Sequence, residues 1–316
     1  MAKREKKGEL SSEAYVRSNF MKIGRGANAV LTIVMILLAA TIILPLLLVV
    51  IISFSSSLSI AHRGYTFFPE QWTLMGYQYL FKSGEQVARS YLITIFYTVT
   101  GTVMALAVMS MFAFVLSQKQ LRGRMFLTFF MYLTMLIHGG LVARYLIYTQ
   151  VYHIDNTIWV FLLPGLVGGY NVFILRTFIN TTIPDSLFEA AKIDGANDFT
   201  VYLRIVMPLF KAGLATIGLF NVVSRWNDWF TGFMYVENPV LIPLQTMLIK
   251  IQKNVDFIMS NSEMSMSPDG LELIKNLPKQ SMQMAIFVVS TLPILCAYPF
   301  FQKYFISGLT IGSVKG

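Results

Sequence analysis

Few residues of this chain have types and spacing suited to chemistry, and the densest group is a polar island at 184–198 with the sequence PDSLFEAAKIDGAND. Its Pro, Asp and Ser residues are typical of a helix start, and Ser186 with Glu189 three positions later fits a capping box. Gly195 supplies the backbone freedom that ends a helical turn. The island therefore predicts a short helix followed by a bend.

A second short helix is predicted directly after the bend. Asn197 or Asp198 can cap it, because either side chain can accept a hydrogen bond from a free amide of the first turn. The segment FTVYLRIVM follows. It must stop near Pro208, because proline has no amide donor and clashes with the preceding turn. The two helices would project from the rest of the chain.

One side of the first helix is predicted to be rich in small residues. Leu187, Ala190, Ala191 and Asp194 share that side at three- and four-residue spacing. Small side chains allow a helix backbone to lie close to another surface. Two interpretations remain open from the residues alone: the helix enters a groove on a partner protein, or it rests on the chain's own helices.

Other chemistry is sparse in this sequence. The chain has no GxxxxGK[ST] phosphate loop, no HExxH motif and no GxSxG motif. Its three histidines are scattered at His62, His138 and His153, and its one cysteine, Cys296, allows no internal disulfide. ATP hydrolysis by a phosphate loop, zinc chemistry and redox chemistry are therefore not expected on this chain.

The composition indicates what kind of elements position these residues. Of the 316 residues, 55% are hydrophobic and 13% are charged, about half the charged fraction usual for soluble domains. Apolar runs of about 18 or more residues are long enough to cross a hydrocarbon core as helices. Six such runs predict six membrane spans, at 29–52, 91–116, 125–149, 158–179, 209–234 and 284–304.

The positions of Lys and Arg predict how the spans are oriented. The arm at 1–27 is basic, and the short loop SQKQLRGR at 117–124 carries three more cations; both belong in the cytoplasm by the positive-inside rule. The run behind the arm is too long for a cleaved signal, so we interpret it as an uncleaved span. The net charge of +9 fits this topology and does not require nucleic acid.

Six spans place the polar island and the C-terminal tail on the cytoplasmic side and the loops at 53–90 and 236–283 outside. We therefore divide the chain into an N-terminal arm at 1–27, a membrane domain at 28–308 and a tail at 309–316. In the large outer loop, 239–255 has apolar residues at helical spacing. That helix could lie over a transport path or simply pack on the spans. The polar stretch at 259–270 is predicted to be a surface segment.

The polar island resembles the cytoplasmic signature loop of permease subunits of binding-protein-dependent ABC importers. The resemblance covers about twenty positions. It includes the triplet EAA, the triplet DGA two residues later, and three single positions beyond. In this sequence the matching residues are Glu189, Ala190, Ala191, Asp194, Gly195, Ala196, Tyr202, Ile205 and Pro208. The resemblance implies that the loop at about 180–208, the coupling loop, docks into a cleft on an ATPase subunit. Glu189 would anchor it by capping or pairing with a basic partner residue, and Gly195 would set its bend.

Further stretches extend the resemblance over most of the chain from position 91 onward. The segment at 138–178, WNDWF at 226–230 and the closing ISGLTIGSVKG are similar to carbohydrate importers of the maltose type, especially the branch for oligosaccharides from complex polysaccharides. The family often has proline where Ala143 and Ala212 stand here. The implied fold is an all-α membrane protein with six transmembrane helices, the type I ABC importer permease fold with cytoplasmic coupling helices.

The resemblance also implies a function and partners. The chain would be the non-catalytic permease subunit of an ATP-driven oligosaccharide importer in the bacterial plasma membrane, with both termini cytoplasmic. It would bind no cofactor itself, since ATP and Mg belong to the partner ATPase. Partners would be a second permease of different sequence, two ATPase subunits and an extracytoplasmic solute-binding protein. The tail at 307–316 is either a second ATPase contact or a free end.

Sugars require hydrogen-bonding amides and acids together with aromatic faces. The residues of these types in or near the predicted spans are Tyr170, Asn171, Asn221, Trp226, Asn227 and Asp228. Alternatives stay open for several of them. Asp228 could instead be an interfacial anchor or pair with Arg225, and the two deeper asparagines could bond between helices. The glycines at 165, 168 and 169 favour close packing over a gate.

Two other functional classes remain to be weighed. An ion-driven secondary transporter or channel should place ionisable residues deep in several spans or show an inverted repeat, and neither is evident in this sequence. An intramembrane enzyme should show a catalytic motif or an acid pair within the spans. The signature loop has no role in either class, so the importer is the leading hypothesis.

Overall fold

The computed structural model describes residues 24–260 and 278–312, with side chains described up to residue 302 except at position 83. The described residues are helical, apart from loops and one isolated bridge between Ser55 and Trp72. The helices that run along the molecule are α2 (Arg25–Ser53), α5 (Gly84–Ser117), α6 (Arg124–Leu136), α9 (Gly169–Thr182), α13 (Lys211–Trp226) and α18 (Lys279–Gly312). Each predicted span contains one of these helices, but among the described residues only three helices are long and apolar enough to cross a membrane, or up to five spans if each of two bent helix pairs counts as one.

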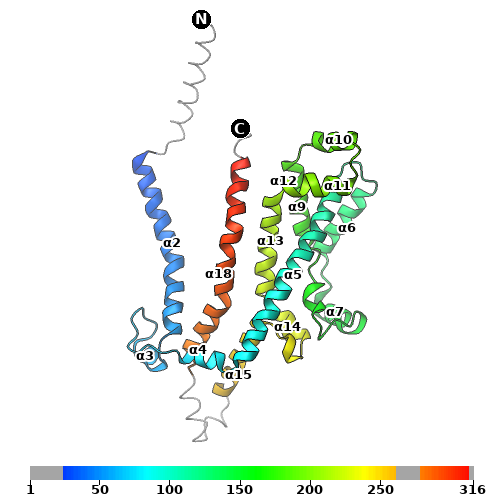
Figure 1. Cartoon of the computed structure of the whole chain (residues 1–316). Coiled ribbons are helices and arrows are strands. Elements are labelled where there is room, and N and C mark those ends of the chain that lie inside the picture. The colour runs from blue at the N-terminus through cyan, green and yellow to red at the C-terminus, as the bar shows by residue number, and fades with distance from the viewer. Residues whose placement is uncertain (1–23, 261–277, 313–316) are drawn as a thin grey trace.

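Short helices cover the two ends of this bundle (Figure 1). At one end lie α10 (Asp185–Ile193), α11 (Asp198–Val201) and α12 (Met207–Leu209). At the other lie α3 (Ser57–Arg63), α4 (Met75–Leu80), α7 (Gly140–Leu146), α14 (Phe230–Tyr235) and α15 (Leu244–Ser260). One further short helix, α8 (Trp159–Leu162), packs against α5 and α14. The polar island thus lies at the opposite end from α14 and α15, the described helices that border and begin the large outer loop.

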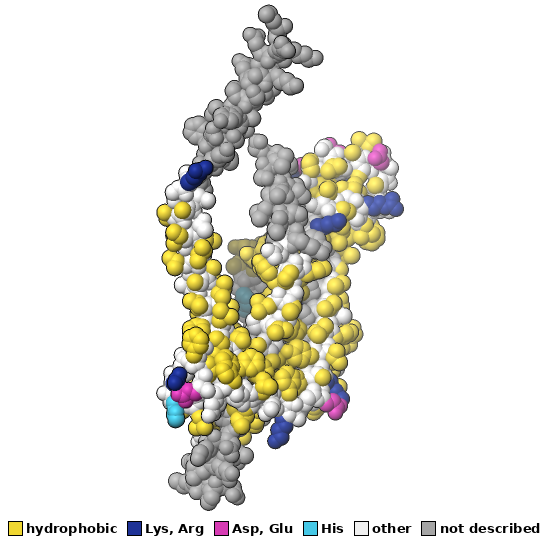
Figure 2. Space-filling view, turned by 60° about the vertical axis from the view of Figure 1, so that its left-hand side comes forward, with side chains coloured by type: hydrophobic (Ala, Val, Ile, Leu, Met, Phe, Trp, Pro, Cys, Tyr) yellow, Lys and Arg dark blue, Asp and Glu magenta, His cyan; other side chains and the backbone are white. Residues whose placement is uncertain are grey.

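Three of the predicted spans are single helices. Arg25–Ser53, Gly84–Ser117 and Lys279–Gln302 are each long and apolar enough to cross a membrane. Side chains of α2 are exposed along most of its length, and nearly all of them are aliphatic. Figure 2 shows hydrophobic side chains covering the flank of the bundle, with Lys, Arg, Asp and Glu near its two ends. Such a surface is stable in lipid rather than in water.

The prediction of a continuous third span is wrong. The chain forms α6 and then turns by 111° into the segment Gly140–Val151, whose last five residues form a π-helix. Gly140 has a positive φ of 79° at the turn, a conformation that costs glycine little and other residues more. The fifth predicted span, 209–234, is also divided, because α13 ends at Trp226 and α14 begins only at Phe230.

The fourth predicted span is likewise not one helix. It consists of α8, an irregular stretch with Gly165 at a φ of 77°, and α9. A 14-residue helix such as α9 extends about 21 Å, short of a hydrocarbon core of about 30 Å. Non-helical backbone at this depth is stable only where protein surrounds it.

The main core joins the bundle to the coupling loop. Met109 of α5, Leu175 of α9 and Ile217 of α13 belong to one buried cluster, which also includes Ala191 and Tyr202 of the coupling loop. Close contacts hold the helices together: a Cβ added at Gly213 of α13 would lie 2.9 Å from Cγ of Phe178 on α9. The end of the molecule that carries the polar island is therefore packed as part of the bundle.

The helix predicted in the outer loop begins later than expected, at Leu244, after a 3₁₀ turn at Pro239–Leu241. Leu244 and Leu248 are buried with Leu80 and Trp226 in a cluster of their own. This position favours the packing interpretation. Residues 1–23 of the N-terminal arm and most of the surface segment at 259–270 lie outside the described residues. The last helix, α18, continues to Gly312, so only the last four residues of the predicted tail lie outside the description.

Candidate functional site

The first helix of the coupling loop, α10, ends in a double hydrogen bond around a left-handed glycine. Gly195 has a φ of 76°, its N–H donates to the carbonyl of Lys192 at 3.1 Å, and the N–H of Ala196 donates to the carbonyl of Ala191 at 2.9 Å. This pair of bonds is the Schellman motif. The bend predicted at Gly195 is confirmed.

The predicted capping box at the start of α10 is wrong. The helix begins at Asp185, its N-cap residue is Pro184, and no side chain caps it. Ser186 is therefore inside the first turn, where its hydroxyl cannot act as a cap for the amide three residues on. Asp185 instead stabilises this end, because its negative charge meets the positive end of the helix dipole and its carboxylate pairs with Lys119.

The second helix starts and ends as predicted. The side-chain oxygen of Asn197 accepts a hydrogen bond from the N–H of Thr200 at 2.8 Å. The chain then passes through α11, a π-helical turn at Tyr202–Val206 and α12, which ends at Leu209, one residue after Pro208. The segment Asp198–Leu209 makes an angle of 80° with α13, so the coupling loop lies across the end of the bundle.

One side of the coupling loop is anchored in the bundle. Ala191 is 6% exposed and Phe188 packs beside it on the main core. The hydroxyl of Tyr202 shares a hydrogen bond of 2.6 Å with the hydroxyl of Ser110 on α5, and its ring lies 5.6 Å from that of Phe114. Ile205 packs against the same core. These residues of the signature hold the loop to its own spans.

The other side of the coupling loop is exposed and partly apolar. Ile193 is 86% exposed, and Leu187 and Phe199 are also largely exposed. Glu189, Ala190, Asp194 and Pro208 lie on the surface as well. In the predicted small-residue face, Ala191 therefore points into the bundle, while Leu187, Ala190 and Asp194 are exposed. The helix therefore rests on its own bundle, and its exposed side leaves the docking interpretation open as a prediction.

A polar recess of about 450 Å³ lies beside α10. Glu189 lines it together with Lys119 and Lys192, and the ammonium of Lys192 donates to the side-chain oxygen of Gln120 at 3.3 Å. The loop between α5 and α6 thus contacts the coupling loop through two exposed lysines. The charges predicted on the cytoplasmic side are brought together here.

At the opposite half of the molecule, two of the predicted substrate residues line one cavity of about 260 Å³. Asn221 of α13 and Asp228, just beyond that helix, share this Arg225 cavity with Tyr97 of α5 and Phe161 of α8. The side-chain amide of Asn221 donates to the carbonyl of Ile217 within its own helix at 3.0 Å. The structure therefore brings together residues from three segments distant in sequence.

Arg225 is the functional candidate that the sequence reasoning missed, having treated it only as a partner for Asp228. It is 8% exposed, and its Nη1 donates to the carbonyl of Phe161 at 2.6 Å. Its own carbonyl accepts from the hydroxyl of Tyr97 at 2.9 Å. A cation in a run of apolar and small residues is a signal in the sequence, but only the fold shows that it is buried.

The proposed pairing of Asp228 with Arg225 is not a direct ion pair. None of the ion pairs within 4.0 Å among the described residues includes either side chain. The carboxylate of Asp228 instead accepts a hydrogen bond from the N–H of Thr231 at 3.0 Å, which stabilises the start of α14.

Trp226 and Asn227 lie apart from this cavity. Trp226 is 4% exposed, its indole N–H donates to the carbonyl of Ser290 at 2.8 Å, and its ring lies 6.3 Å from that of Tyr91. Asn227 is exposed, and its backbone N–H closes the last turn of α13 on Val223. Trp226 joins α13 to α18 in this structure.

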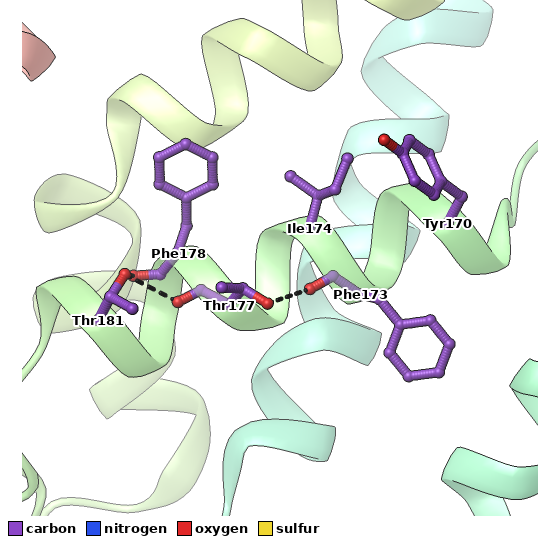
Figure 3. A pocket seen from close by; sticks show the side chains of 6 residues that line it. All are labelled: Tyr170, Phe173, Ile174, Thr177, Phe178 and Thr181. Carbon is purple, nitrogen blue, oxygen red and sulfur yellow. Dashed lines mark hydrogen bonds between the residues drawn. The ribbon is translucent and has the colours of Figure 1, made fainter.

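Tyr170 lines a different and mostly apolar groove of about 320 Å³ along α9 (Figure 3). Tyr170, Ile174 and Phe178 lie on one side of the helix and Phe173 on the other. The hydroxyls of Thr177 and Thr181 donate to carbonyls of the preceding turn, each at 2.9 Å. Tyr170 is 63% exposed, so its ring is free to meet a second surface.

The glycine run has different roles at its three positions. A Cβ at Gly169 would lie 2.8 Å from Cγ of Met135 and 3.1 Å from the carbonyl oxygen of Met131. That contact supports close packing of α9 on α6. Gly165 makes a positive-φ turn, and Gly168 precedes α9 beside the half-buried Asn171. Asn171 lines neither the Arg225 cavity nor the α9 groove.

The sequence was compared with known proteins. Residues 118–311 match the family described as "Binding-protein-dependent transport system inner membrane component". The chain is 35% identical over 264 residues to the polygalacturonan/rhamnogalacturonan transport system permease protein YtcP of Bacillus subtilis, covering 84% of this chain and 89% of that one. It is also 35% identical to Protein LplC of the same organism, with 84% and 86% covered.

A solved structure is similar over nearly its whole length. It is described as the crystal structure of a bacterial ABC transporter involved in the import of the acidic polysaccharide alginate. The matched chain is 28% identical, with a TM-score of 0.73, and the match covers 90% of this chain and 99% of that one. The broken spans described above therefore occur in a fold that an experimental transporter shares.

Proposed function

Because the chain belongs to the family of binding-protein-dependent transport system inner membrane components, we propose that it is the permease subunit of an ATP-driven oligosaccharide importer. The names of its relatives support a polymeric sugar: polygalacturonan or rhamnogalacturonan for one and arabinooligosaccharides for another, which is 25% identical. The similar solved transporter imports alginate. The chain would form part of the path through the membrane.

The observation that carries this proposal is the two-sided coupling loop. Its inner side is buried in the main core through Ala191 and Tyr202, while its outer side leaves Ile193 almost fully exposed. A surface that is apolar, exposed and rigidly held is suited to docking a partner protein. We assign that partner as an ATPase subunit, with Glu189 beside the contact.

The packing suggests how force would pass from the partner to the spans. ATP-driven closure of the ATPase dimer would move the docked α10 as a rigid body. The hydrogen bond between Tyr202 and Ser110 would transmit that motion to α5, and the core contacts would transmit it to α9 and α13. Tilting of these helices would exchange inward for outward access.

The remaining partners follow from the same proposal. A complete importer would contain a second permease of different sequence, two ATPase subunits and an extracytoplasmic solute-binding protein. ATP and Mg would bind to the ATPase subunits and no cofactor to this chain. The end of the bundle with α10 would face the cytoplasm, as would both termini, and the end with α15 would face outward. The Arg225 cavity and Tyr170 of the α9 groove would border the sugar path.

Gentle solubilisation of membranes that contain the tagged chain, followed by mass spectrometry of what co-purifies, tests the proposal. We expect an ATPase and a second permease with the wild type, and loss of the ATPase with Ile193→Glu or Glu189→Lys. A matched control is Val240→Glu, which adds the same charge at an exposed apolar residue of the opposite end. A chain that purifies alone in every case would contradict the proposal and favour a secondary transporter or channel.

A further inference from the structure

We propose that the Arg225 cavity recognises a sugar carboxylate, so that the imported oligosaccharide contains uronate units. This inference rests on the proposed function and specifies its substrate class. It starts from an incomplete hydrogen-bonding pattern. Arg225 is more than nine-tenths buried and lines the cavity, yet its Nε and Nη2 have no hydrogen-bond partner among the described residues. Buried polar groups are almost always paired, so an unpaired cation requires an explanation.

The two unpaired nitrogens are the ones that a carboxylate needs. In a guanidinium group the Nε–H and one Nη2–H point in the same direction, and they form a fork that matches the two oxygens of a carboxylate. Nη1 is already committed to the carbonyl of Phe161 at 2.6 Å. The hydrogen bond from Nη1 thus fixes the orientation of the guanidinium group. The edge formed by Nε and Nη2, which could bind both oxygens of a carboxylate, is not used by this bond.

The surrounding backbone holds the guanidinium in place. A Cβ at Gly101 of α5 would lie 2.6 Å from Nη1 and 2.8 Å from Cζ of Arg225. Only a glycine allows the plane of the group to lie this close to the helix. The absence of a side chain at position 101 therefore sets the position of the fork, together with the bond to Phe161.

No protein carboxylate occupies that edge among the described residues, since Arg225 takes part in none of their ion pairs within 4.0 Å. Asp228 lines the same cavity, but its carboxylate accepts from the N–H of Thr231. An anion next to Asp228 would be repelled, whereas hydroxyl donors would be attracted. A uronate satisfies both conditions, because it carries one carboxylate for Arg225 and several hydroxyls for Asp228 and Asn221.

The size and closure of the cavity fit one sugar unit on a path. Its volume of about 260 Å³ is slightly below the range of about 300–1,000 Å³ typical of sites for whole ligands, which fits one unit of an oligosaccharide. Nε and Nη2 are shielded from solvent in this structure. The turn at Pro164 and Gly165 lines the cavity, and a Cβ at Gly165 would lie 3.9 Å from Nη2. Because the two nitrogens are shielded, a carboxylate could reach them only after a local movement of the surrounding groups.

The test uses the assembled transporter with its binding protein in proteoliposomes. Uptake of trigalacturonate and of trimannuronate is compared with uptake of the methyl ester of each. We expect the wild type to favour the acids, and Arg225→Met to lower the acid-to-ester ratio about tenfold or more, since a hydrogen bond to a charged group contributes about 1.5–3 kcal/mol. Arg225→Lys should give an intermediate ratio, because it retains the charge and loses the fork.

The control variant is Arg89→Gln, which removes the same charge from an exposed pair with Glu85 and should leave the ratio unchanged. Selectivity of the binding protein cancels in the comparison, because the same binding protein serves every variant. An assembled Arg225→Met transporter with the wild-type ratio would overturn the inference. So would a wild type that takes up both esters as well as the acids.

A second measurement needs no variant and no transport. The thermal unfolding midpoint of the wild-type complex, without binding protein, is measured with each acid and with its ester. We expect at least one acid to raise the midpoint more than its ester does, and equal shifts for both pairs would overturn the inference. The result separates the two proposals. A complex that imports only neutral sugars and shows equal shifts retains the importer function and loses the uronate site.

Discussion

The coupling loop and the Arg225 cavity treat polar and apolar groups in opposite ways. At the coupling loop the buried hydroxyl of Tyr202 is paired with Ser110, and an apolar side chain, Ile193, is left exposed. In the cavity the rings of Tyr97 and Phe161 stack at 4.8 Å, and two nitrogens of the buried Arg225 have no partner in the described part of the chain. The first pattern is typical of a protein docking surface, and the second of a site for a small polar ligand.

Transport should suffer most when the bend of the coupling loop is removed. Gly195→Val places a β-branched residue at a φ of 76°, which costs about 1–3 kcal/mol where the structure enforces it. We expect uptake to fall more than tenfold while the protein still inserts. Gly195→Asn is the matched control, because asparagine tolerates this conformation. Full uptake by the valine variant would show that transport does not require the bend at Gly195.

A smaller effect is expected in the cavity from Gly101→Ala. The new methyl would collide with the guanidinium of Arg225, and the group would have to leave the carbonyl of Phe161. Acid-to-ester uptake should fall several-fold, less than for Arg225→Met, because the charge remains. Gly218→Ala on α13 is the control, since its Cβ would meet only side chains, the nearest at 3.3 Å. Equal acid-to-ester uptake ratios in both variants would show that the orientation of Arg225 does not affect the selection of the acid.

Removing one hydroxyl from the inner side of the coupling loop should act mildly. Tyr202→Phe retains the ring against Phe114 and removes the hydrogen bond to Ser110, whose hydroxyl keeps its bond to the carbonyl of Ala107; the loss is about 0.5–1.5 kcal/mol. We expect the number of ATP molecules hydrolysed per sugar imported to rise two- to threefold, because less of the loop's motion would be transmitted to α5. Thr200→Val, at a half-exposed position of the same loop, tests whether any change there has this effect. An unchanged ratio in Tyr202→Phe would show that force reaches α5 by other contacts.

The smallest effect is expected at the exposed pair of Lys119 and Asp185. Exposed ion pairs contribute about 0–1 kcal/mol, so Lys119→Gln should change uptake less than twofold at physiological salt. The thermal midpoint of the complex should shift by no more than a few degrees. A tenfold loss of uptake would mean that the polar recess beside α10 is itself part of the ATPase contact.

Local signals in the sequence predicted the coupling loop well. Gly195 and Asn197 determine their own turns through backbone conformation and a short-range hydrogen bond, so their roles can be inferred without the fold. The predicted start of α10 is two residues too late, because the N-cap is Pro184, which makes no side-chain bond, and not Ser186. A helix that starts with a capping box and a helix that starts after an N-cap proline have similar residues in similar order. Only the backbone conformation distinguishes the two.

The broken spans and Arg225 could not be predicted in the same way. An apolar run at 125–149 or 158–179 satisfies the length of a span, while turns at Gly140 and Gly165 depend on helices elsewhere that surround the irregular backbone. The environment of Arg225 is made by Phe161 and Gly101, each far from it in sequence. A long-range contact of this kind leaves no local pattern beyond a cation in an apolar segment.

Crosslinking from position 193 would show whether the outer side of α10 docks on an ATPase, as we propose. In a Cys296→Ser background, which removes the one native cysteine, Ile193→Cys and Val240→Cys would each be labelled with a photoactivatable reagent in membranes. We expect an ATPase adduct from position 193 and none from position 240. A transport-competent Ile193→Cys protein that yields no ATPase adduct would contradict the claim.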